Sequence, residues 1–155
     1  MRKRAEVLAR LEARRDKVLA ELHPLLRARV TELLDLMDGR VSPWCGYRGP
    51  ADQLAALEAG NSRARFGESP HNFRPALACD VVLHPARVHA RPHPDDVESP
   101  DLWADESEDA LATWAALDHA AERVGLDRVS FMRRGVLVTD LPHLQLPGWR
   151  SLIPH

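Results

Sequence analysis

Polar residues that could carry out hydrolysis are concentrated in two short segments. The first contains Ser69, His71 and Asp80, and the second contains Asp140 and His143. Two imidazoles and one carboxylate form a natural three-ligand set for a catalytic zinc ion, which keeps a fourth position open for water. Asp140 remains as a carboxylate that could take a proton from that water and return it to a leaving amine. These residue types suggest a zinc peptidase with Asp140 as its general base.

The spacing of Asp140 and His143 requires a bend in the chain. On a regular strand, residues three apart face opposite sides. Pro142 lies between them and cannot donate a hydrogen bond to a neighbouring strand, so it favours a bend or bulge that turns both side chains toward one cleft. Spacing alone leaves an alternative open, in which His71 lies in a loop and His143 at the end of a strand without a metal.

Helices are predicted where apolar residues recur at helical spacing. Two such segments lie on either side of Pro24, and the second ends at Gly39. The first, within residues 1–22, is the more charged and could be peripheral to the core. A shorter helix is predicted over Ala51–Ala59, and a long one over Asp105–Val124.

Short apolar runs bounded by turn-forming residues predict strands. These runs cover 41–45, 78–83, 129–132 and 136–139, and residues 144–146 could continue the sheet. The segments 61–76 and 84–104 lack periodicity, so we expect a loop and a surface excursion there. Helices combined with short strands that do not alternate with them predict one α+β domain spanning residues 1–155.

Composition excludes several classes of protein. The chain has 155 residues, of which 45% are hydrophobic and 28% charged, as in an ordinary soluble globular domain. A net charge of −2 gives no reason to expect nucleic acid as a partner. Charges such as Glu6 and Arg10 interrupt the apolar run that a signal peptide needs, so we expect synthesis in the cytoplasm. We also expect no stable membrane insertion, because no apolar stretch approaches bilayer-spanning length. Cys45 and Cys79 lack metal-ligand spacing, and one disulfide between them remains open.

Three segments resemble, in the same order, the motifs of the M15 zinc peptidases in the form typical of phage L-alanyl-D-glutamate endopeptidases. SPHNFRPALACDVV at 69–82 resembles the signature Ser-x-His-Asn-x-x-Pro-x-x-Ala-x-Asp. CGYRGPADQ at 45–53 is similar to the segment Gly-Tyr-Arg-Ser-x-x-x-Gln, and TDLPHLQL at 139–146 resembles an ending of the form acidic-x-Pro-His-Phe-Glu. Residues 22–34 also resemble the helix that opens such domains, so the resemblance spans roughly 22–150.

The resemblance implies a role for each matched residue. Asp140 would be the general base, and Arg48 would bind a substrate carboxylate or the oxyanion. Ser69 would orient the substrate or the ligand loop, which is the loop that carries His71. The zinc ligands would be His71, Asp80 and His143. The implied fold is a small antiparallel sheet flanked by helices, of the Hedgehog and D-Ala-D-Ala-peptidase type. The sequence departs from the family motifs at Gly49, Ala76 and Gln145, and these departures affect the expected substrate preference more than the expected chemistry.

The function implied by the resemblance is zinc-dependent cleavage of the peptidoglycan stem peptide between L-alanine and D-glutamate. Such an enzyme would be a monomeric phage endolysin that acts on the cell wall after its release from the cytoplasm. Two alternatives remain open. One is a D-alanyl-D-alanine carboxypeptidase or dipeptidase of the same superfamily, and the other is a non-catalytic, metal-stabilised module that binds the cell wall or belongs to a phage particle.

Overall fold

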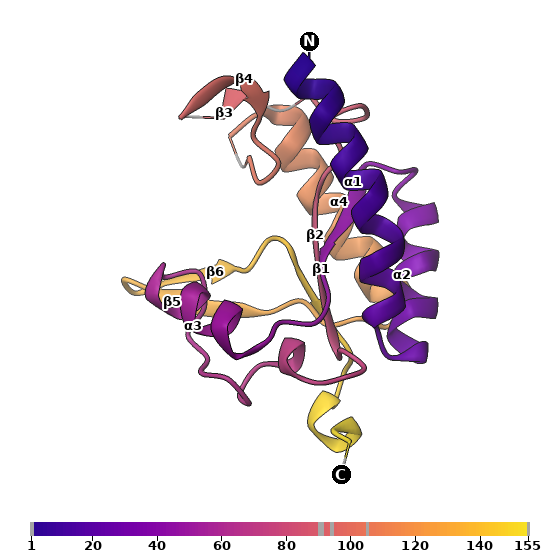
Figure 1. Ribbon diagram of the computed structural model, residues 1–155, viewed down its shortest axis with the longest axis vertical. Helices are drawn as coiled ribbons and strands as arrows, with labels where there is room; N and C mark the ends of the chain where they lie inside the picture. The colour runs from indigo at the N-terminus through magenta and orange to yellow at the C-terminus, as the bar shows by residue number, and fades with distance from the viewer. Residues whose placement is uncertain (1, 90–91, 94, 105, 155) are drawn as a thin grey trace.

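The computed structural model describes residues 2–89, 92–93, 95–104 and 106–154. Within these residues the chain forms four α-helices, which are α1 (Arg2–Glu21), α2 (Pro24–Leu36), α3 (Pro50–Glu58) and α4 (Glu108–Val124). Helices α1, α2 and α4 gather on one side of the strands β1 and β2, whereas α3 and the β5–β6 hairpin are drawn on the other side (Figure 1). None of the described helices is long and apolar enough to cross a bilayer.

The helix ends follow from capping residues in the sequence. Pro24 begins α2, as expected from its tolerance in a first turn, and the side chain of His23 accepts a hydrogen bond from the Leu25 amide. Ser107 caps α4 by accepting from the Ala110 amide, so this helix begins later than the predicted Asp105. Gly125 ends α4 in the left-handed region, at a φ of 76°.

The described strands form small antiparallel sheets. The central sheet has the order β1 (Val41–Cys45), β2 (Ala78–Leu83) and β7 (His143–Gln145). Two hairpins flank it, one formed by β3 (Pro92–His93) and β4 (Asp96–Pro100), the other by β5 (Ser130–Arg133) and β6 (Val136–Thr139). The predicted α+β class with a small antiparallel sheet is therefore confirmed. The β3–β4 hairpin lies in the segment expected to be a surface excursion, and β5 and β6 pair only with each other.

The core lies between β2 and the helices. Buried residues of α2 and α4, such as Leu33 and Leu117, pack in one cluster with Val81 and Cys79 of β2. Helix α1 also contributes, because its residue Val18 belongs to this cluster. Successive side chains of a strand face opposite sides, so burying Cys79 and Val81 leaves Asp80 on the other face of β2. Both cysteines are free, which answers the question of a disulfide between them.

Candidate functional site

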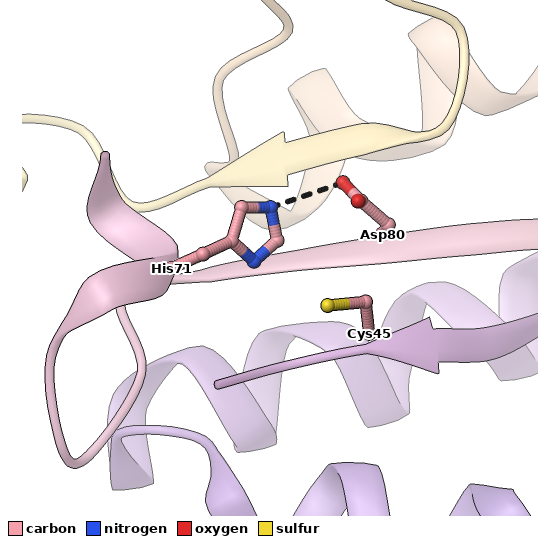
Figure 2. A group of neighbouring side chains, drawn as sticks. All are labelled: Cys45, His71 and Asp80. Carbon is pink, nitrogen blue, oxygen red and sulfur yellow. Dashed lines mark hydrogen bonds and ion pairs between the residues drawn. The ribbon is translucent and has the colours of Figure 1, made fainter. Parts of the chain in front are cut away.

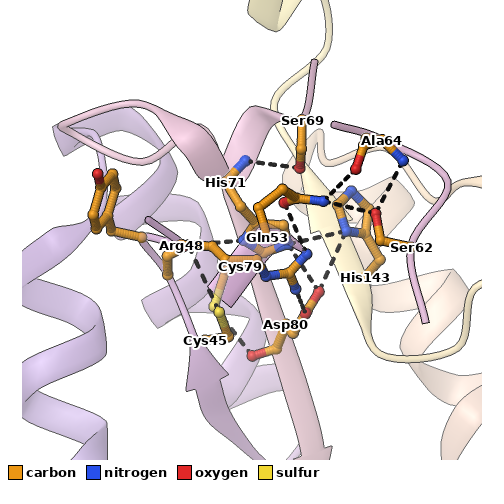
Figure 3. A network of polar contacts seen from close by, with 12 residues as sticks. Cys45, Arg48, Gln53, Ser62, Ala64, Ser69, His71, Cys79, Asp80 and His143 are labelled. Carbon is orange, nitrogen blue, oxygen red and sulfur yellow. Dashed lines mark hydrogen bonds and ion pairs between the residues drawn. The ribbon is translucent and has the colours of Figure 1, made fainter. Parts of the chain in front are cut away.

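The three side chains expected to bind a metal converge at the β1–β2–β7 sheet (Figure 3). His71 Nε2 lies 3.1 Å from Asp80 Oδ1 and 3.3 Å from His143 Nδ1. The third side of the triangle, from His143 Nδ1 to Asp80 Oδ1, is 3.3 Å. Ligands about 2.0 Å from a tetrahedral zinc ion lie about 3.3 Å from one another. The three atoms therefore have the spacing of three corners of such a site.

The convergence follows from strand register and one short helix. Asp80 and His143 are direct partners in the antiparallel pairing of β2 with β7, and such partners project from the same face of a sheet. His71 lies in a short 3-10 helix, Pro70–Asn72, within the segment predicted to be a loop. The Leu77 amide donates to the Pro70 carbonyl at 3.0 Å and so holds this helix against the start of β2.

Hydrogen bonds on the far side of each imidazole select which nitrogen faces the cluster. His71 Nδ1 lies 2.7 Å from the carbonyl oxygen of Gly46, and His143 Nε2 lies 2.9 Å from Oε1 of Gln145. Both oxygens can only accept, so these two nitrogens carry the protons of the neutral rings. The unprotonated nitrogens then point at each other and at the Asp80 carboxylate. Three electron-rich atoms in this arrangement repel one another unless a cation lies between them.

The end of α1 supports the carbonyl that orients His71. Glu21 Oε2 accepts a hydrogen bond of 2.9 Å from the Tyr47 amide, next to Gly46. A Cβ atom at Gly46 would lie 3.1 Å from both Glu21 Oε2 and Leu22 Cδ2, closer than real Cβ atoms normally come. The glycine therefore permits the close approach of this backbone to α1.

The pKa values of the buried ligands show how strongly the cluster attracts positive charge. Burial acts to lower the pKa of His71, but the charge and hydrogen bond of Asp80, with a smaller contribution from Cys45, raise it from 6.5 to about 10. Burial acts to raise the pKa of Asp80, yet His71 and His143 hold it well below 3.8. Without a metal, a proton on His71 supplies the positive charge that the carboxylate requires.

Cys45 is a further possible donor that sequence spacing did not indicate. It pairs with Asp80 across β1 and β2, and its sulfur points toward His71 (Figure 2). The donor atoms of Cys45, His71 and Asp80 all lie within 4.8 Å of one another. Donor atoms on a tetrahedral zinc, one of them sulfur, would lie about 3.5 Å apart. The tighter set of His71, Asp80 and His143 therefore matches a metal site better, and Cys45 lies beside it.

Asp140 lies on the turn that leads into β7. The His143 amide donates to the Asp140 carbonyl at 3.2 Å, so the chain bends between the two residues, where Pro142 led us to expect a bend. The pKa of the Asp140 carboxyl is raised from 3.8, chiefly by burial and further by Asp80, while His143, His71 and Arg128 act to lower it.

Arg48 and Ser69 both contact the ligand set. Arg48 Nη2 donates to Asp80 Oδ2 at 3.3 Å, whereas His71 contacts the other carboxylate oxygen, Oδ1. Ser69 caps the 3-10 helix, because its hydroxyl accepts from the His71 amide at 3.3 Å while its own amide donates to Asn72 Oδ1. Of the two roles expected for Ser69, contact with the ligand loop is the one present in the structure.

Gln53 connects this loop to the rest of the site, and sequence reasoning gave it no role. Its side chain is fully buried, with 0% exposure. Its Oε1 accepts from Arg48 Nη1 at 3.3 Å and from Asn72 Nδ2 at 3.0 Å, while its Nε2 donates to Ala64 O at 2.7 Å and to Ser62 Oγ at 2.9 Å (Figure 3). Its place in the matched segment 45–53 was the only sequence signal for it.

Arg128 supports His143 from behind. Its Nη1 donates to the His143 carbonyl at 2.6 Å, and its Nε donates to Asp118 Oδ1 at 2.7 Å. Among the described residues, its buried Nη2 has no hydrogen-bond partner. Arg128 was not singled out from the sequence, because an arginine beside a strand is usually exposed.

Comparison with known proteins shows a likeness to a solved structure. No protein-family model matches the chain, and no curated protein matches it. Among solved structures, it is similar to the crystal structure of the Serratia marcescens L-Ala D-Glu endopeptidase ChiX, with a TM-score of 0.55 and 24% sequence identity over 90% of each chain. The chain shares its fold with this endopeptidase. The likeness agrees with the fold that the sequence motifs implied.

Proposed function

We propose that this protein is a zinc-dependent peptidoglycan hydrolase that cleaves the stem peptide between L-alanine and D-glutamate. The observation that carries the proposal is the triangle of His71 Nε2, Asp80 Oδ1 and His143 Nδ1, with sides of 3.1 to 3.3 Å. The fold shared with an L-Ala D-Glu endopeptidase supports the class of substrate.

Two nitrogen donors and one oxygen donor suit zinc and leave a position for water and substrate. When bound, zinc would polarise the scissile carbonyl and lower the pKa of a water molecule to near 7. Asp140 then acts as the general base, taking a proton from the attacking water and delivering it to the departing amine of D-glutamate. Its raised pKa suits this transfer, because a base whose pKa lies nearer the operating pH takes the proton from water more readily and can still release it to the amine.

Arg48 acts on both the protein and the substrate in this proposal. Two of its N–H groups hold Asp80 and Gln53, and a guanidinium has five such donors. The remaining donors bind a substrate carboxylate or the oxyanion. Ser69 keeps the ligand loop in place, so that His71 approaches the metal from a fixed direction.

The proposed biological setting is that of a phage endolysin. The enzyme is made in the cytoplasm, acts as a monomer and reaches the cell wall after release. Its partner is the stem peptide, and neither nucleic acid nor membrane insertion takes part.

Mass analysis of digested muropeptides tests this function. We expect the zinc-loaded protein to release stem peptides whose new amino terminus is D-glutamate. Release of alanine or of its dipeptide would instead indicate a D-alanyl-D-alanine peptidase. Absence of any cleavage by the zinc-loaded protein would indicate a non-catalytic module.

The variant Asp140→Ala tests the assignment of the base. We expect it to bind zinc with unchanged stoichiometry and to lose turnover. The matched control is Asp35→Ala, which removes an exposed carboxylate on α2 and should leave the rate unchanged. Normal wall lysis by Asp140→Ala would rule out this residue as the base.

A further inference from the structure

A surface pocket lies along α3, the helix that carries Gln53. Its volume is about 370 Å³, and α3 provides much of its wall. The residues that line it are Pro50, Leu54, Leu57, Arg65 and Phe66. Leu54 and Phe66 remain 54% and 47% exposed, which leaves apolar surface available to a bound molecule.

Hydrogen bonds fix this pocket relative to the metal ligands. Helix α3 begins two residues after Arg48, whose guanidinium bonds to Asp80. Gln53 on this helix accepts from Arg48 with its Oε1 and donates with its Nε2 to the Ala64 carbonyl, next to Arg65. This series of hydrogen bonds, from Asp80 through Arg48 and Gln53, therefore ends at the backbone next to Arg65 in the pocket wall.

The pocket carries a positive charge, because Arg65 is the charged residue among those that line it. Among the residues that the structure describes, none forms a hydrogen bond or ion pair with the Arg65 guanidinium. The nearby Glu68 carboxylate accepts from the Arg65 backbone amide at 3.0 Å, not from its side chain. A free guanidinium fork beside an apolar wall suits a ligand that combines a carboxylate with an aliphatic chain.

We propose that this pocket binds the stem peptide on the downstream side of the scissile bond, with Arg65 pairing with one of its carboxylates. The inference rests on the proposed function, which supplies an acidic peptide beside the metal site. D-Glutamate linked through its side chain keeps a free α-carboxylate, and the diamino acid that follows can carry another. The aliphatic part of that residue lies against Leu54 and Phe66.

Synthetic stem peptides with selected carboxylates converted to amides test the proposal. One peptide has both carboxylates free, one is amidated at D-glutamate, and one is amidated at the diamino acid. We expect the wild-type protein to lose on the order of tenfold in kcat/KM, mainly through KM, when the contacted carboxylate becomes an amide. The amide that causes the loss identifies which carboxylate Arg65 binds.

Variants then assign the effect to the pocket. Arg65→Gln should raise KM for the free-carboxylate peptide and abolish the discrimination, and Leu54→Glu should raise KM more for the free acid than for the amide. Arg123→Gln is the matched control, because it removes an exposed arginine on α4. Cleavage with the same KM and the same preference in wild type and Arg65→Gln would overturn the pocket assignment alone. Absence of cleavage by the zinc-loaded wild type would instead overturn the proposed function.

Discussion

Gln145 accepts a hydrogen bond from His143, with 2.9 Å between Oε1 and Nε2. The two residues are two positions apart on β7, so their side chains leave the same face of the strand. The amide oxygen holds the proton of His143 on Nε2 and leaves Nδ1 directed at His71 and Asp80. Gln145 therefore determines how His143 faces the candidate metal site, although it is not itself a ligand there.

Loss of this contact should weaken zinc binding. We expect Gln145→Ala to lower zinc affinity by about 10- to 100-fold, because His143 loses the group that fixes its ring and its tautomer. Competition with a chromophoric chelator measures the dissociation constant. Gln145→Glu serves as the control and should keep or increase the affinity, since a carboxylate accepts the same bond more strongly. Equal affinity in wild type and Gln145→Ala would contradict the orienting role.

Zinc binding should release a proton. In the metal-free protein the pKa of His71 is about 10, so this residue is protonated at neutral pH, while the lowered pKa of Asp80 leaves that group ionised. Zinc must displace the proton from His71, and its affinity should therefore rise with pH until the pH approaches 10. Calorimetry at neutral pH in two buffers of different ionisation enthalpy should report the release of about one proton. A binding enthalpy that does not depend on the buffer would show that His71 is already neutral.

The stability of the metal-free protein should depend on pH on both sides of a maximum. The pKa of His71 is raised on folding, so its contribution to the free energy of unfolding is complete below pH 6.5 and is lost as the pH rises toward 10. The pKa of Asp80 is lowered on folding, so its contribution to the free energy of unfolding is present above pH 3.8 and is lost as the pH falls below that value. We expect urea denaturation of the metal-free protein to show lower stability at pH 9 than at pH 6. The variant His71→Gln should show a smaller change over this range, and an equal change in both proteins would exclude His71 as its source.

The sequence allowed prediction of the parts of the fold that depend on local pattern. The strands at Val41–Cys45 and Ala78–Leu83 have the predicted bounds, because short, mostly apolar runs between turn-forming residues are a strong local signal. The break between α1 and α2 at Pro24 is equally local. The helix over Pro70–Asn72 was missed, since three residues are too few for any periodicity to be detected.

The geometry of the site depends on register, which the sequence does not encode locally. The pairing of Asp80 with His143 requires β7 to lie next to β2, and β7 is only three residues long. Gln53 and Gln145 were not predicted to support the site, because a buried glutamine and a solvated one look alike in a sequence. Only the hydrogen bonds of the folded chain reveal that both are used to orient other residues.

Arg48 offers a way to separate support of the ligands from contact with the substrate. Its Nη2 bonds to Asp80 Oδ2, so we expect Arg48→Met to lower zinc affinity by about tenfold, because Asp80 loses a partner that fixes its orientation. Arg48→Lys keeps the charge but not the planar fork, and it should recover only part of that affinity. Chelator competition gives the affinities, and the same measurement on Arg123→Met controls for the loss of an exposed arginine. If zinc affinity stays unchanged in Arg48→Met while kcat/KM falls, the contact with Asp80 is incidental and Arg48 acts on the substrate alone.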